Sequence, residues 1–304
     1  MTTECNTEIQ WKTVELEHKS MIQKFLREEG SRNCEMTFAN IYLWSREVYK
    51  MKFAVIEDTL CFLKEGEEVS VTYPAGNGDK KKAIEKLHGY FRSQEKTFRL
   101  HLVDADQFKT LEEMYPGKAS IVYDRDSADY VYEVEKLVQL SGKKYHGKKN
   151  HINRFIANYP QWSYEDITSE NVDECIKMAQ EWGKENHCDE DKEKQAELKV
   201  TLQGLAMLEE LELTGGLIRG EDKVVGFSFG EPVNQDTYVV HVEKAFAGIQ
   251  GAYPLINREF LRANATEYTY VNREEDVGSE GLRKAKLSYH PVFMLEKGLV
   301  VIEE

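Results

Sequence analysis

The chain has 304 residues, 41% of them apolar and 31% charged, which is typical of a globular protein with two domains that each bury a core. The net charge of −14 at pH 7 disfavours a general affinity for nucleic acid, so we expect no DNA partner. The sequence contains no apolar run of about 18 residues and no secretory signal, and we therefore expect a cytoplasmic protein with no transmembrane segment.

Cysteine usage agrees with a reducing compartment. Five cysteines without a CxxC pair predict neither a disulfide framework nor a thiolate zinc site; they are Cys5, Cys34, Cys61, Cys175 and Cys188. The adjacent His187, Cys188 and Asp189 could bind an adventitious ion, but such a trio is common by chance. We expect no metal site and no required cofactor.

In the first half, periodicity and turn signals predict a helix followed by alternating strands and helices. Ile84, Leu87 and Phe91 have the spacing of a helix that buries one face. The expected elements are a helix over 15–29, a hairpin of strands 53–56 and 59–63, a strand over 69–73, a helix over 79–91, a strand over 98–103, a helix over 107–115 and a strand over 119–123.

The second half predicts the same order of elements. Tyr253, Ile256 and Phe260 form the inner stripe of its central helix. The expected elements are helices over 172–182 and 192–213, strands 217–219 and 224–229 joined by a turn, a strand over 238–243, a helix over 252–263, a strand over 268–271, a helix over 278–289 and a strand over 292–295.

The two halves therefore form a weak internal repeat with an offset of roughly 165–175 residues. The repeat is one of pattern and not of sequence identity. We place the boundary after Ser141-Gly142, a plausible helix stop, which gives an N-terminal domain over 1–142 and a C-terminal domain over 143–304. The C-terminal domain is expected to carry the site.

The most informative segment runs from Asn272 to Pro291 and reads NREEDVGSEGLRKAKLSYHP. A carboxylate cluster at a strand end is followed by a glycine turn and a short helix with Arg283 and Lys286 on one face. Leu282, Ala285 and Tyr289 have the spacing to pack this helix inward. Carboxylates facing a cationic helix suit proton removal beside an anionic group, whereas the structural alternative is a surface loop and a solvated helix.

The stretch GLRKAKLSYHP resembles the last helix and strand of the lysyl-phosphatidylglycerol synthase C-terminal family, which is related to Fem-type peptidyltransferases. DYVYEVEKLVQLSGKKYHGKKNHINRF, from Asp129 to Phe155, resembles the inter-domain stretch of the same family. The resemblance implies an α+β protein with mixed sheets in two tandem N-acetyltransferase (GNAT)-like domains. It implies aminoacyl-tRNA as the donor, and a hydroxyl or amine of a lipid headgroup or small molecule as the acceptor.

Direct acyl transfer needs a base, a donor to the oxyanion and aligned substrates, but no protein nucleophile. Glu243 ends a central strand and is our first candidate base; Asp276 is the second. Asn272 is expected to orient the acyl group. By resemblance to the family's GLRxxK pattern, Arg283 and Lys286 are expected to bind a substrate phosphate.

The bend that contains Gly248 and Gly251 precedes a predicted helix, where free backbone N–H groups could bind a phosphate. The spacing of its glycines departs from the acetyl-CoA-binding pattern, which argues against acetyl-CoA. The structural alternative is that the glycines permit a tight turn. The bend at Gly76 and Gly78 in the first half reads as an ordinary turn.

A basic run lies at the predicted domain junction and is the local patch that a polyanion requires. We expect its cations to contact tRNA or lipid phosphates; they include Lys144, Lys148, Lys149 and Arg154. The structural alternative is a solvated linker helix. Ile152 and Phe155 are expected to pack into the core.

Two further functions stay open at the level of sequence. One is a CoA-dependent N-acyltransferase, and the other is a non-catalytic tandem protein retained for binding or regulation. The acceptor, the amino acid and the oligomeric state cannot be read from these residues.

Overall fold

The computed structural model describes residues 9–303, which form two compact units. Unit 1 contains the described residues up to Ser31, together with Met36–Ala128 and the residues from Leu295 onward. Unit 2 contains Arg32–Glu35 and Asp129–Met294. The chain passes from unit 1 to unit 2 at residue 128, so the boundary expected after residue 142 lies inside unit 2. Cys5 lies outside the described residues.

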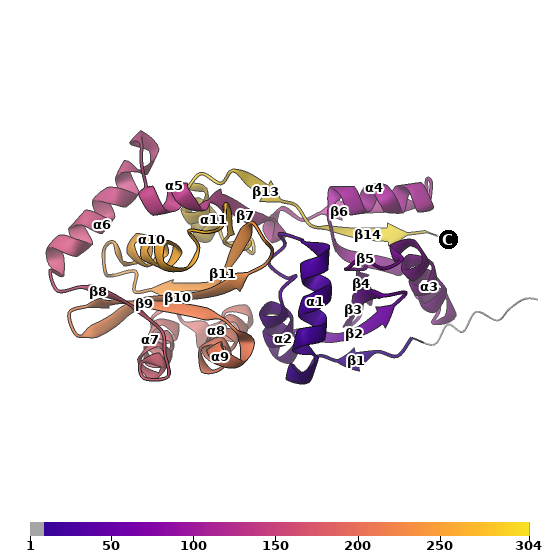
Figure 1. Ribbon diagram of the computed structural model, residues 1–304, viewed down its shortest axis with the longest axis horizontal. Helices are drawn as coiled ribbons and strands as arrows, with labels where there is room; N and C mark the ends of the chain where they lie inside the picture. Colours follow the sequence, from indigo (N-terminus) through magenta and orange to yellow (C-terminus); the bar gives the residue numbers. More distant parts are fainter. Residues whose placement is uncertain (1–8, 304) are drawn as a thin grey trace, which may run out of the picture. The chain divides into compact units, whose positions relative to one another are not determined.

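Unit 1 is a seven-stranded mixed sheet with helices, in the strand order β1-β2-β3-β4-β5-β14-β6 (Figure 1). Its elements are β1 (Lys12–Thr13), η1 (Leu16–His18), α1 (Lys19–Glu29), α2 (Phe38–Glu47), β2 (Lys50–Ile56), β3 (Thr59–Glu65), β4 (Ser70–Thr72), α3 (Lys80–Ser93), β5 (Phe98–Val103), α4 (Ala105–Met114), β6 (Ala119–Tyr123), η2 (Arg125–Ser127) and β14 (Gly298–Ile302).

Unit 2 is also built on a seven-stranded mixed sheet, in the strand order β13-β7-β12-β11-β10-β9-β8. Its elements are β7 (Asp129–Glu133), α5 (Val134–Gln139), η3 (Lys143–Tyr145), α6 (His146–Asn158), β8 (Ser163–Asp166), α7 (Val172–Glu185), η4 (Cys188–Glu190), α8 (Lys192–Ala206), α9 (Leu208–Leu211), β9 (Thr214–Gly220), β10 (Lys223–Pro232), β11 (Thr237–Ala245), α10 (Ala252–Asn264), β12 (Tyr270–Asn272), α11 (Glu280–Leu287) and β13 (Phe293–Leu295).

The two sheets share one plan. Each contains an antiparallel hairpin, a parallel pair (β4 with β5, and β11 with β12) and an inserted strand beside that pair. In each sheet the inserted strand comes from the other half of the chain. β14, near the C-terminus, lies between β5 and β6 of unit 1, and β7, from the first half, lies between β12 and β13 of unit 2. The protein is therefore an α+β chain of two tandem GNAT-like modules that have exchanged their last strands.

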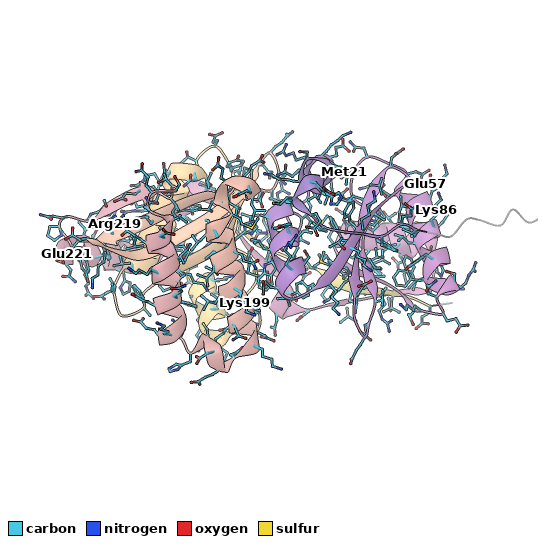
Figure 2. The ribbon with its side chains drawn as sticks, turned by 90° about the horizontal axis from the view of Figure 1, so that it is seen from below. Met21, Glu57, Lys86, Lys199, Arg219 and Glu221 are labelled. Carbon is cyan, nitrogen blue, oxygen red and sulfur yellow. The ribbon has the colours of Figure 1, made fainter. Side chains whose placement is uncertain are left out.

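Local chemistry explains the elements of unit 1. Glu57 and Asp58 both have positive φ, which is the geometry of a two-residue hairpin turn between β2 and β3. Lys86 on α3 forms an ion pair with Glu57 in that turn (Figure 2). Asp79 caps α3 by accepting from the backbone N–H of Lys82 at 3.1 Å. The predicted stripe of α3 is buried, with Ile84, Leu87 and Phe91 fully shielded from solvent.

Unit 2 has its own apolar core under α10 and α6. Ile256, Phe260, Ile152 and Phe155 are all fully buried there, as expected. At the far edge of the sheet, Arg219 of β9 forms ion pairs with a carboxylate on β8 and another on α7 (Figure 2). This guanidinium fastens the edge strand and one helix to the sheet.

Several elements were not expected from the sequence, among them α2, β7, β8 and β14. The expected inner face of α11 was also wrong. Leu282 is 39% exposed and Ala285 is exposed, whereas Lys286 is only 8% exposed, and of the expected stripe only Tyr289 is buried. The physical reason is that Lys286 turns inward to bond backbone carbonyls, which an apolar side chain cannot do.

Candidate functional site

The site of interest in unit 2 lies where two parallel strands part. β11 and β12 pair at three positions, of which the last joins Val239 to Asn272. Beyond this point β11 stays with β10 up to Ala245, while the chain after β12 stays with β7, because Arg273 N donates to Tyr130 O at 3.0 Å. Side chains from the two diverging strands fill the opening between them.

The first pair across this opening is Glu243 with Arg273. Arg273 Nη2 donates to Glu243 Oε1 at 2.8 Å, and Asn257 Nδ2 of α10 donates to Glu243 Oε2 at 2.8 Å. The guanidinium also lies 5.6 Å from the ring centroid of Tyr132 and 4.7 Å from that of Tyr289. Burial opposes its charge, but the Glu243 carboxylate and the neighbouring tyrosines leave the pKa of Arg273 raised.

Two polar atoms of this cluster are unsatisfied. Among the described residues, none hydrogen-bonds to Arg273 Nη1 or to Asn257 Oδ1, although both atoms are buried. A buried donor and a buried acceptor left without partners each cost free energy of about 1–3 kcal/mol. Such atoms in a well-packed unit indicate a place for a ligand or ordered water.

Lys148 on α6 is the second cation of the cluster. Its Nζ lies 3.9 Å from the ring centroid of Tyr289, so both cations lie against the same ring. Burial and the nearby Arg273 lower the pKa of Lys148 to about 8, although Glu243 acts in the opposite direction. A fraction of this amine is therefore neutral near physiological pH.

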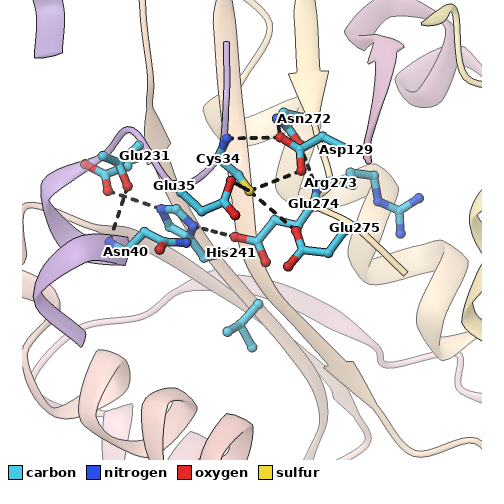
Figure 3. A network of polar contacts seen from close by, with 12 residues as sticks. Cys34, Glu35, Asn40, Asp129, Glu231, His241, Asn272, Arg273, Glu274 and Glu275 are labelled. Carbon is cyan, nitrogen blue, oxygen red and sulfur yellow. Dashed lines mark hydrogen bonds and ion pairs between the residues drawn. The ribbon is translucent and has the colours of Figure 1, made fainter. Parts of the chain in front are cut away.

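The second pair across the opening is His241 with Glu274 (Figure 3). His241 Nδ1 lies 2.8 Å from Glu274 Oε1, and Nε2 lies 3.1 Å from Glu231 Oε1 on β10. Burial opposes the charge of the ring, but the two carboxylates outweigh it and raise the pKa of His241 to about 9. His241 is therefore an imidazolium at neutral pH, held between two glutamates.

A thiol and carboxylates lie beside this pair in unit 2 (Figure 3). Cys34 Sγ lies 3.3 Å from Asp129 Oδ1, and one ligand atom from each of Cys34, Glu35 and Asp129 falls within 4.8 Å of the others. These residues have the atom types of a metal site. Asp129 is nevertheless already bonded, since its Oδ2 accepts from Cys34 N at 3.1 Å and from Asn272 Nδ2 at 2.8 Å.

Asn272 lies in the site, and both polar atoms of its side chain are hydrogen-bonded. Its amide donates to Arg32 O and to Asp129, and its Oδ1 accepts from the backbone of Glu274 at 2.7 Å. It is fully buried. These contacts fix the end of β12 and the segment that contains Cys34.

Asp276 and Arg283 form an ion pair with each other. Arg283 Nε and Nη2 donate to the two oxygens of Asp276 at 2.9 and 2.8 Å, and Tyr130 OH donates to the same carboxylate. The Arg283 hydrogen bond holds the pKa of Asp276 well below its usual range. Lys286 Nζ donates to the carbonyls of Arg273, at 2.7 Å, and Glu275. These three residues brace the loop that presents Arg273.

The bend before α10 is covered by α6. Gly251 has a φ of +92°, and a Cβ at this position would lie 2.2 Å from the carbonyl oxygen of His151. A Cβ at Gly248 would meet nothing within 4 Å. Gly251 therefore permits the close approach of α6, whereas Gly248 borders open space.

The remaining basic residues of the junction lie on the exposed side of α6 and η3. Lys149 and Arg154 are exposed, and Lys144 Nζ lies 5.0 Å from the ring centroid of Tyr145. Lys148 differs from these three because it turns inward, toward Tyr289.

The corresponding bend of unit 1 already contains an anion of its own. Gly76 N donates to Glu29 Oε2 at 2.9 Å, and Lys80 Nζ lies 2.6 Å from the same carboxylate oxygen. The Glu29 carboxylate thus already accepts from the backbone of this bend and pairs with the first lysine of α3.

From the sequence, Glu243 was named as the first candidate base, but Arg273 and Asn257, which bond to it, were not named, and Tyr289 was assigned to packing alone. One signal was available for Arg273. It directly follows Asn272, and adjacent residues of an extended strand point to opposite faces of the sheet, which predicts that Arg273 faces the side that Asn272 does not. Asn257 lies four residues after Tyr253 on the predicted helix, which places both on one face.

A family model described as phosphatidylglycerol lysyltransferase, C-terminal, matches residues 27–300. The chain belongs to the phosphatidylglycerol lysyltransferase C-terminal family. A conserved protein of unknown function from Bacteroides thetaiotaomicron VPI-5482 is 40% identical, with a TM-score of 0.93 over 97% of this chain and 100% of that one.

Two members with lower identity show that the fold is shared. L-PGS from Bacillus licheniformis is 14% identical with a TM-score of 0.61 over 93% of this chain and 91% of that one. The C-terminal domain of a putative lysylphosphatidylglycerol synthetase from Agrobacterium fabrum is 11% identical with a TM-score of 0.62 over 95% and 92%.

A curated relative, an uncharacterized protein of Mycoplasmoides gallisepticum, is 26% identical over 179 residues. This match covers 58% of the chain and 56% of that relative, so the chain spans little more than half of its length. Within the described part of the chain, every helix is too short or too polar to cross a bilayer.

Family membership indicates an acyltransferase related to lysylphosphatidylglycerol synthase.

Proposed function

We propose that unit 2 transfers an aminoacyl group from aminoacyl-tRNA to a hydroxyl or amine of a lipid or small molecule. Family membership supports this class of reaction. The observation that carries the proposal is the Glu243–Arg273 pair in the opening between β11 and β12, where a carboxylate lies beside a buried donor without a partner.

In this reaction Glu243 acts as the base. It removes the proton of the acceptor hydroxyl or amine as the acceptor atom bonds to the acyl carbon. Arg273 Nη1 donates to the oxyanion that forms on that carbon, which is the place where a fixed cationic donor contributes most. The ester C–O bond of the donor then breaks, and the proton passes to the departing hydroxyl.

Asp276 is a poorer base than Glu243, because its lowered pKa and four hydrogen bonds stabilise the carboxylate. We assign Asp276, Arg283 and Lys286 to positioning, since they hold the loop that carries Arg273. Asn272 has the same role at the end of β12.

The exposed cations of α6 and η3 supply a surface for the donor. Lys149 and Arg154 lie on α6, which packs against the α10 bend, and Lys144 lies on η3 just before it. Cations spaced in this way suit contact with a phosphate backbone. Because the whole chain is acidic, this basic surface is a local exception to its net negative charge. Because aminoacyl-tRNA is a cytoplasmic donor, the proposal places the protein in the cytoplasm.

The proposal is tested by incubating the protein with a mixture of radiolabelled aminoacyl-tRNAs and an extract of lipids and metabolites. We expect label to move from tRNA into a lipid, a peptide or a small amine. A parallel reaction contains labelled acetyl-CoA in place of the tRNA. Transfer from acetyl-CoA alone would contradict the proposal in favour of a CoA-dependent enzyme, and transfer from neither would favour a binding protein.

A further inference from the structure

The Glu243 cluster contains more buried positive charge than negative charge. Arg273 and Lys148 are two cations, and Glu243 is the carboxylate within reach of both. Glu243 is bonded to Arg273 Nη2 and Asn257 Nδ2, each at 2.8 Å. Among the described residues, no carboxylate forms a salt bridge with Lys148. A buried cation is unfavourable unless an anion pairs with it.

The hydrogen bonds of Arg273 also indicate a missing anion. Its Nη1 is a buried donor without a partner among the described residues, although Nη2 of the same group is paired. The side chain as a whole is only 10% exposed, so bulk water does not satisfy this atom. Tyr289 does not satisfy it either, because its ring lies against the cation as a π surface.

We infer that Arg273 and Lys148 bind an anionic oxygen of a ligand, a phosphate or a carboxylate, beside Glu243. The anion accepts from one of the two N–H bonds of Arg273 Nη1, which leaves the other for the oxyanion of the proposed reaction. A singly charged anion brings the cluster to two positive and two negative charges. Both cations lie against the ring of Tyr289, with Lys148 Nζ 3.9 Å and the Arg273 guanidinium 4.7 Å from its centroid.

Asn257 adds a requirement on the ligand. Its Oδ1 is a buried acceptor without a partner, on the opposite side of the amide from Glu243. A ligand that carries a hydroxyl or amine near its anionic oxygen satisfies this atom as well. Inorganic phosphate, which carries both oxyanion and hydroxyl groups, is therefore a suitable probe.

This site is distinct from the exposed basic surface of α6. Lys149 is adjacent to Lys148 in sequence but exposed, whereas Lys148 is half-buried and faces Arg273 and Glu243. The inference deepens the proposed function, because it assigns a position to the anionic group of a substrate. It rests on the proposed function only in one respect, which is the kind of molecule that carries this anion.

The test uses Lys148 as a reporter. The whole protein is acetylated with N-acetoxysuccinimide over a pH series, with and without inorganic phosphate, and each lysine is quantified by mass spectrometry. Without phosphate we expect half-maximal reactivity of Lys148 near pH 8, the pKa that burial and Arg273 impose. With phosphate the midpoint rises, because an adjacent anion favours the charged amine. The exposed Lys184 of α7 serves as the internal control and should not respond.

Binding is measured separately by calorimetry with phosphate on two matched variants. Lys148→Met should weaken phosphate binding by roughly tenfold or more, the usual effect of losing a charge-assisted hydrogen bond. Lys184→Met should bind as the parent does, because Lys184 is an exposed lysine at the end of α7 that takes part in neither proposed site. Neither variant depends on replacing the buried Arg273.

Further probes distinguish the source of the anion. Glycerol phosphate represents a lipid headgroup, AMP represents the end of a nucleic acid, and acetate represents a free carboxylate; stronger protection of Lys148 by one of them identifies its class. If none of the four probes changes Lys148 acetylation, or if Lys184→Met weakens binding as much as Lys148→Met, the inference is wrong. These measurements require no aminoacyl-tRNA and no turnover, so they can succeed where the transfer assay fails.

Discussion

At the scale of single residues, Asp276 shows how a buried carboxylate organises the loop after β12. It accepts from Arg283 Nε and Nη2, from Tyr130 OH and from Gly278 N, and it is fully buried. We predict that Asp276→Asn lowers the free energy of unfolding by about 3 kcal/mol, because it leaves Arg283 without its carboxylate. Urea denaturation measures this change.

The control for this prediction lies on α11, the helix that carries Arg283. Glu280 is 87% exposed and forms a 3.8 Å ion pair with Lys284, so Glu280→Gln should change stability by less than about 0.5 kcal/mol. Equal effects of the two substitutions would contradict the structural role of Asp276.

His241 makes a pH-dependent contribution to stability. Its folded pKa of about 9 lies above the unfolded value of about 6.5. The contribution is therefore complete below about pH 6.5 and is lost as the pH rises through about 9. We expect the stability advantage of the parent over His241→Gln to shrink by roughly 2–3 kcal/mol between pH 6 and pH 9.5. An advantage that stays constant over this range would show that the ring is neutral when folded.

At the scale of elements, the α10 bend gives a matched pair of glycines. Gly251→Ala should destabilise the protein by roughly 2 kcal/mol or more, because its φ of +92° is unfavourable for alanine and the new Cβ would meet the His151 carbonyl. Gly248→Ala meets open space and should change the melting temperature little. Differential scanning calorimetry of both variants compares them directly, and similar melting temperatures would contradict the close packing of α6 on this bend.

Elements with a strong period were predictable from the sequence. Ile84, Leu87 and Phe91 predicted α3, and the strands of both hairpins were expected near their observed positions. The inner face of α11 was not predictable in this way. Lys286 is buried because two backbone carbonyls accept from its amine, and carbonyl positions depend on the loop conformation and not on residue spacing.

The site was predictable in part for a similar reason. Glu243 was expected at the end of its strand, but its pairing with Arg273 depends on where β11 and β12 part. This parting follows from β12 continuing to pair with β7, a strand from much earlier in the chain. Local sequence does not reveal which distant strand completes a sheet.

At the scale of the whole molecule, each module is completed by a strand from beyond its own sequence repeat. β14 pairs with β5 through Val301↔Arg99 and with β6 through Val301↔Ser120, so it is a central strand of unit 1. Deleting residues 296–304 should therefore expose the amides of β5 and β6 to rapid hydrogen exchange, while those of β9–β11 keep their protection. Unchanged protection of β5 would contradict the exchange of strands.

The central claim is that acyl transfer occurs at the Glu243–Arg273 pair of unit 2. The most direct measurement compares the rate of label transfer from aminoacyl-tRNA by the parent, Glu243→Gln and the control Glu165→Gln, each below its melting temperature. Glu165 belongs to the distant Arg219 ion pair, which keeps a second carboxylate in Glu174. The account predicts a loss of roughly 10²–10⁴-fold for Glu243→Gln and little change for Glu165→Gln. Parent-like transfer by folded Glu243→Gln would contradict it.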